Sequence, residues 1–206
     1  MNLYSGKDCP HSQRARIVAF EKDIVLDILW VDESDPPQEV YELNPANDLP
    51  VLVDRDLVLH NSYVIMEYLD ERFPHPPLMP IDPVARAQAR LMLDSIDKDW
   101  YSGMMRLLAG GGAKKTQESA RKVIRDGLAA VAPMFSRQEF AVGDAFSLVD
   151  CALAPLIWRL PQLDIALPKS AAPVLAYGQR LFRREGFRMS LCQVEREARA
   201  EALAGE

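Results

Sequence analysis

The sequence predicts an α/β domain followed by an all-helical domain. Three observations support this division: strands and helices alternate over about the first 73 residues, a proline-rich run follows, and the remaining segments carry only helical spacing. We therefore divide the chain into a first domain over residues 1–73, a linker over 74–81 and a helical domain over 82–206.

Apolar spacing and turn signals predict seven elements in the first domain. They are a short strand at 1–4, a helix at 10–22, a buried strand at 26–31, a short helix at 38–44, a hairpin of strands at 51–53 and 57–59, and a helix at 63–73. This order is the thioredoxin-like arrangement. A helix crossover makes the first strand pairing parallel, and the hairpin makes the last one antiparallel.

The second domain changes to helical spacing after four prolines in residues 74–80, which can neither continue a helix nor lie inside a sheet. Asp82 is a capping residue with Pro83 at the first helical position, and a long helix runs from there to about Leu108. Ser147 and Asp150 form a capping box at the start of a later helix. Further helices are expected at 117–135, at 172–184 and in the charged tail.

The charge of the chain is unevenly distributed. Residues 1–80 hold 6 Lys+Arg against 15 Asp+Glu, a net of −9, whereas residues 81–206 hold 18 against 15, a net of +3. An acidic front half argues against direct binding to nucleic acid and suits a basic protein partner, although it equally suits a solvated surface that aids solubility.

The composition predicts a cytoplasmic protein. No apolar run reaches the ~18–20 residues that span a bilayer, and the opening MNLYSGKDCP does not resemble a signal peptide. The 3 cysteines are widely spaced and form neither a disulfide pattern nor a zinc pattern. We expect no metal and no membrane partner.

Cys9 is the first candidate for chemistry. It lies between the predicted first strand and first helix, where the helix dipole and free amides lower the pKa of a thiol and make it nucleophilic. Ser12 stands where a second cysteine would be needed for dithiol chemistry, so only one-thiol chemistry is open. The alternative is a scaffold turn that carries an incidental thiol.

Two further segments match places where thioredoxin-like folds bind ligands. Pro50 precedes the third strand and is expected to be cis, which turns the backbone of Val51 toward a ligand, although an ordinary trans turn is the alternative. Asn61 and Ser62 begin the next helix, whose N-terminus suits a carboxylate. Ser62 is equally explained as a simple N-cap.

Pro74, His75 and Pro76 form the third candidate. Their neighbours hold His75 outside both predicted domains, and a preordered segment loses little entropy on binding. This favours a partner surface, and the alternative is a stiff linker that fixes the angle between domains.

From Ser12 to Glu197 the chain resembles the bacterial stringent starvation protein A family. The matching runs are SQRARIVAFEK, NPANDLPVLVDRDLVLHNS, IMEYLDERFPHPPLMP, KDWY and FSLVDCALAPLIWRLPQL. The run over 65–80 is the most specific, because general glutathione transferases share the fold and the FSLVD-type helix start but not that run.

The resemblance implies a glutathione-transferase fold without the usual transferase activity. It also implies a homodimer that binds RNA polymerase holoenzyme with its sigma factor and supports stress, acid-tolerance and phage-related transcription. Pro74, His75 and Pro76 map on the family's partner surface. A vestigial glutathione site maps on Cys9, Ser12, Pro50, Val51, Asn61 and Ser62.

Cys9-Pro10 departs from the family and is more like omega-type transferases and glutaredoxins. The alternative function is therefore a glutathione-dependent thiol transferase that uses Cys9, and a third possibility is a plain structural scaffold. The regulator needs no cofactor, and glutathione is expected only under the alternative.

Overall fold

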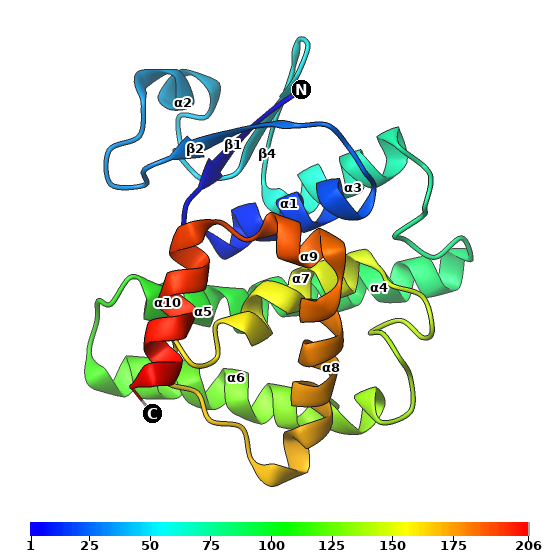
Figure 1. Cartoon of the computed structure of the whole chain (residues 1–206), viewed down its shortest axis with the longest axis vertical. Helices are drawn as coiled ribbons and strands as arrows, with labels where there is room; N and C mark the ends of the chain where they lie inside the picture. The colour runs from blue at the N-terminus through cyan, green and yellow to red at the C-terminus, as the bar shows by residue number, and fades with distance from the viewer. Residues whose placement is uncertain (206) are drawn as a thin grey trace. The chain divides into compact units, whose positions relative to one another are not determined.

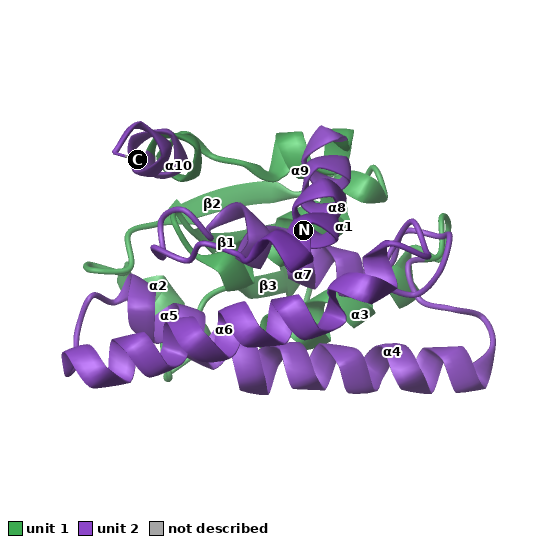
Figure 2. Ribbon diagram, turned by 90° about the horizontal axis from the view of Figure 1, so that it is seen from below, with its two compact units in different colours: residues 1–77, 184–197 green, residues 78–183, 198–206 purple. Residues whose placement is uncertain are grey.

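The computed structural model describes residues 1–205 and divides into two compact units (Figure 1, Figure 2). Unit 1 consists of Met1–Pro77 and Arg184–Glu197, and unit 2 of Leu78–Arg183 with the residues from Ala198 on. The sequence-based division placed 184–197 in the helical domain, whereas in the structure this segment belongs to unit 1. Glu206, the last residue of the predicted helical domain, lies outside the described residues.

Unit 1 has the predicted strand-helix-strand-helix-strand-strand-helix order. The elements are β1 (Asn2–Gly6), α1 (Pro10–Glu21), β2 (Asp27–Val31), α2 (Gln38–Leu43), β3 (Val51–Asp54), β4 (Leu57–His60) and α3 (Ser62–Arg72). The sheet order is β2-β1-β3-β4, with β1 parallel to β2 and antiparallel to β3, and β3 antiparallel to β4. The thioredoxin-like prediction is confirmed.

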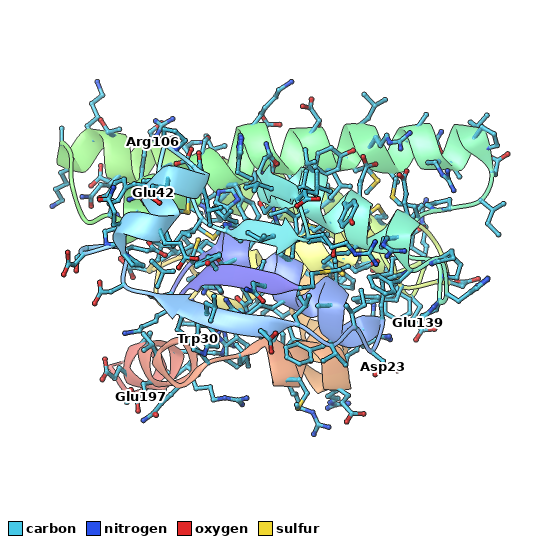
Figure 3. All side chains as sticks on the ribbon, turned by 90° about the horizontal axis from the view of Figure 1, so that it is seen from above. Asp23, Trp30, Glu42, Arg106, Glu139 and Glu197 are labelled. Carbon is cyan, nitrogen blue, oxygen red and sulfur yellow. The ribbon has the colours of Figure 1, made fainter. Side chains whose placement is uncertain are left out.

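β2 is not the buried strand that its apolar sequence predicted. It forms an edge of the sheet, with β1 as its neighbour, and its side chains are largely solvated. Trp30 is 44% exposed and Leu29 39% exposed, and Figure 3 shows Trp30 on this strand. A continuous apolar run indicates two covered faces only when the strand lies inside the sheet.

α1 is buried along most of its length and packs against α3 and α9 (Glu185–Ser190). It carries two arginines, Arg14 and Arg16, that are almost inaccessible to solvent. Arg16 is satisfied by Glu195, whose two carboxylate oxygens each accept from Arg16 Nη2 at 2.7 Å. Because a buried cation needs a partner, this pair explains why 184–197 belongs to unit 1.

The described part of unit 2 is helical. Its elements are α4 (Pro83–Ser95), the π-helical segment η1 (Ile96–Tyr101), α5 (Ser102–Leu108), α6 (Lys114–Phe135), α7 (Leu148–Trp158), the 3₁₀ segment η2 (Lys169–Ala171) and α8 (Ala172–Arg183). The last helix, α10 (Gln193–Ala204), begins in unit 1 and continues into the residues of unit 2 from Ala198 on. Asp82 caps α4 through a 2.8 Å bond from the Ala85 amide, as predicted.

The predicted long helix to Leu108 is interrupted by the π-helical segment η1. The wider turn places Trp100 against α6, where a Cβ added at Gly127 would lie 2.5 Å from the indole Nε1. The hydroxyl of Tyr101 donates to the Ala152 carbonyl at 2.8 Å. π-helical turns carry no simple apolar signature, so helical spacing alone did not predict the break. Across residues 1–205, no helix combines the length and apolar character needed to cross a membrane.

Candidate functional site

Cys9 lies where the sequence predicted it, at the N-cap of α1 with Pro10 as the first helical residue. The side chain is only 4% exposed, and its Sγ donates to the Leu49 carbonyl at 3.8 Å. The Leu49-Pro50 peptide bond is cis, as expected, and Val51 opens the buried strand β3. The fold therefore brings Cys9 and the segment before β3 together.

Ser12 and Tyr4 are both occupied by structural contacts. Ser12 is buried, and its Oγ accepts from the Gly6 amide at 3.1 Å, which fixes the turn between β1 and α1. Tyr4 donates its hydroxyl to Glu39 at 2.5 Å. Burial and the neighbouring Glu39 carboxylate raise the pKa of Tyr4 to about 12. A phenol held in this way does not offer its proton to a thiol.

The start of α3 differs from the expectation in one respect. The N-cap is Asn61, whose side chain accepts from the Tyr63 amide at 2.9 Å, so Ser62 is the first helical residue and not the cap. Ser62 Oγ instead accepts from Arg14 Nε at 2.8 Å and lies 3.1 Å from His11 Nδ1. The sequence analysis did not identify Arg14, although an arginine in the middle of an otherwise buried helix signals a fixed polar partner.

The residues near Cys9 match only part of a glutathione site. The cis proline and the buried Val51 suit the extended backbone of the tripeptide. However, glutathione has a carboxylate at each end, and the nearby Glu39, the hydrogen-bond partner of Tyr4, is itself acidic. Asn61 is neutral, and Ser62 is already bonded to Arg14.

Pro74, His75 and Pro76 are all exposed. A hydrogen bond from Lys22 holds the segment in place. Lys22 Nζ donates to the Pro76 carbonyl at 2.5 Å and to Asp70 Oδ1 at 2.6 Å. Of the two acidic residues that precede the segment, Asp70 is buried and paired with Lys22, whereas Glu71 is exposed. Among residues 1–205, no group of three His, Cys, Asp or Glu side chains could hold a metal ion.

Comparison with known families assigns both parts of the chain. Residues 3–77 match the glutathione S-transferase N-terminal domain, and residues 85–185 match the C-terminal domain. A stringent starvation protein A homolog of Coxiella burnetii is 45% identical over 200 residues, covering 97% of this chain and 95% of that protein. The chain belongs to the stringent starvation protein A family. A homolog of the same name from Pasteurella multocida is 43% identical over 93% of this chain and 90% of its own length.

Solved structures agree with the fold of this stringent starvation protein A family member. Glutathione transferase Omega 3C from Trametes versicolor superposes with a TM-score of 0.81 at 26% identity, over 99% of this chain and 90% of that one. A ternary complex of the bacterial glutathione transferase BphK gives a TM-score of 0.87 at 21% identity, over 95% of this chain and 99% of that one. At that identity the likeness concerns the fold alone.

Proposed function

We propose that this protein regulates transcription by binding RNA polymerase holoenzyme, including its sigma factor, on a glutathione-transferase scaffold that does not catalyse conjugation. The observation that carries the proposal is the exposed Pro74-His75-Pro76 segment, held in place by a buried lysine. A proline-rich segment that is already ordered loses little conformational entropy when a partner binds it. Membership in the stringent starvation protein A family supports the same function.

The contacts around Cys9 support a role without conjugation. Activation of a glutathione thiol needs a hydroxyl or cation directed at the sulfur. Tyr4 donates its hydroxyl to Glu39, and Ser12 Oγ accepts from the Gly6 amide. The Glu39 carboxylate, which accepts from Tyr4 beside Val51, would oppose the carboxylates of glutathione. We therefore propose no resident cofactor.

The second candidate is a glutathione-dependent thiol transferase. Cys9 favours it, because the thiol lies at a helix N-terminus beside a cis proline, and the Omega-class structure named above is similar over nearly the whole chain. In its first step the Cys9 thiolate would attack glutathione disulfide, which forms a mixed disulfide between Cys9 and glutathione and releases one molecule of reduced glutathione. Mass spectrometry after incubation with glutathione disulfide detects that adduct.

We propose that the protein forms a homodimer in the cytoplasm and that this dimer binds protein partners but not nucleic acid. Large apolar side chains support self-association: Val64 on α3 and Leu57 on β4 in unit 1, and Val84 and Leu91 on α4 in unit 2, are each at least 40% exposed. The net charge of −9 over residues 1–80 opposes contact with phosphates and suits a basic protein surface.

The test is a binding assay with purified bacterial RNA polymerase, as core enzyme and as holoenzyme. The parental protein should bind the holoenzyme, and His75→Ala should weaken that binding. His60→Ala is the matched control, because His60 is also an exposed histidine of unit 1. Equal binding by the parent and His75→Ala would remove the segment from the mechanism, and no binding by the parent would refute the proposed function.

A further inference from the structure

The Lys22 side chain has an unusual position for a lysine. Lys22 is the C-cap of α1, and its side chain has 0% solvent accessibility. The ammonium group donates to Asp70 Oδ1 on α3 at 2.6 Å and to the carbonyl oxygen of Pro76 at 2.5 Å. All three residues belong to unit 1, so this contact joins the end of α1, the last turn of α3 and the proline-rich segment.

The proline-rich segment has few ways of fixing its own position. Pro74, Pro76 and Pro77 have no backbone N–H, so they cannot donate the hydrogen bonds that normally hold a chain in place. Lys22 supplies a side-chain donor to the Pro76 carbonyl. Asp70 compensates the buried positive charge, which would otherwise be costly.

We propose that Lys22 is a positioning residue, which sets the arrangement in which Pro74, His75 and Pro76 are presented to a partner. The inference rests on the proposed function for its biological meaning, but the positioning itself is a property of the protein alone. Lys22 does not touch the partner, since its side chain is buried beneath the segment. It acts through the Pro76 carbonyl, one residue after His75.

A neighbouring ion pair provides a matched control. Glu21 precedes Lys22 on α1 and accepts two bonds from Arg184, at 2.9 and 2.6 Å, within unit 1. This pair also lies at the end of α1 and is partly buried, and its two hydrogen bonds do not involve the proline-rich segment. Glu21→Gln weakens it without affecting the Pro76 carbonyl. A role of Lys22 in general stability predicts similar behaviour for both variants, whereas a positioning role does not.

The first readout needs no partner. The chain has 3 histidines, so the ring resonances of His75 can be assigned by NMR from the loss of a signal in His75→Ala. Lys22→Met keeps the apolar stem and removes the donor. We expect it to shift or broaden the His75 ring signals and to leave those of His60 in place. Glu21→Gln should leave both unchanged.

A second variant guards against loss of folding. Lys22→Met alone leaves the Asp70 carboxylate buried beside an apolar group, and Lys22→Met/Asp70→Leu removes that charge without adding a donor to Pro76. The same change in the His75 signals is expected in the double variant. Unchanged His75 signals in a folded variant without Lys22 would overturn the proposal.

The second readout is a double-mutant cycle on polymerase binding. Lys22→Met should weaken binding about tenfold in the parent, as expected for loss of a charged hydrogen-bond donor. It should have almost no further effect in a His75→Ala background, in which binding is weakened but still measurable. An equal loss in both backgrounds would overturn the positioning role. If Lys22→Met alters the His75 signals but the parental protein does not bind polymerase, the positioning role stands and the proposed partner is refuted.

Discussion

Replacement of Asp150 by alanine should cost far more stability than loss of an ordinary helix cap. Asp150 is fully buried and accepts four hydrogen bonds: from the Ala141 amide at 2.8 Å, the Ser147 amide at 2.8 Å, the Ser147 hydroxyl at 2.6 Å and the Tyr177 hydroxyl at 2.6 Å. The capping box predicted from the sequence is present, and it is part of this larger network within unit 2.

The size of this loss in stability follows from the hydrogen-bond donors that would lose their acceptor in Asp150→Ala. The two amides and the Tyr177 hydroxyl would remain buried without Asp150, and each orphaned group costs roughly 1–3 kcal/mol. Burial also raises the pKa of Asp150, so removing the carboxyl relieves part of its desolvation cost. We therefore expect Asp150→Ala to lower the free energy of unfolding by about 3–4 kcal/mol. A simple cap contributes only ~1 kcal/mol.

Urea denaturation followed by circular dichroism measures this difference, with Asp82→Ala as the matched control. Asp82 is also a capping aspartate of unit 2, but it is exposed, and one hydrogen bond reaches its carboxylate, from Ala85. The control should lose ~1 kcal/mol or less. If the two variants lose the same stability, the buried network does not contribute as its geometry implies.

Three further outcomes are expected. Because the pKa of Tyr4 is raised from 10.0 to about 12, its contribution to stability is complete below pH 10.0 and is lost as the pH rises toward 12. The stability difference between the parent and Tyr4→Phe, measured by urea melts across that pH range, should therefore shrink, and a constant difference would contradict this expectation. Conjugation of glutathione to an aryl halide should stay near background in the parent and in Cys9→Ala, and turnover of ~1 s⁻¹ or faster that disappears in Cys9→Ala would favour the enzyme. Light scattering at micromolar concentration should give twice the 23.2 kDa of one chain, and the mass of a single chain would refute the dimer.

Local patterns predicted the features that depend on neighbours in sequence. The element order of unit 1 and the caps at Asp82 and Ser147 follow from short-range spacing and were predicted. The cis Pro50 was predicted from its place before the third strand of a thioredoxin-like fold. The edge position of β2 was not, because an apolar run does not reveal how many strands lie beside it.

Contacts between distant residues account for what the sequence analysis missed. Arg16 and Glu195 are separated by 179 positions, and their ion pair is one of the contacts that hold 184–197 within unit 1. Ser62 was identified, but its partner Arg14 lies 48 positions away. Lys22 and Pro76 are 54 positions apart. Each case involves a buried cation on α1, and such a cation signals that a partner exists without saying where it lies.

The measurement that tests the central claim most directly compares polymerase binding and thermal stability in the same preparations. Replacing Pro74, His75 and Pro76 together with alanine should leave the melting temperature and the oligomeric state nearly unchanged, because these side chains are exposed. It should abolish capture of RNA polymerase holoenzyme by the immobilised protein. A folded triple variant that still binds polymerase with parental affinity would contradict the account.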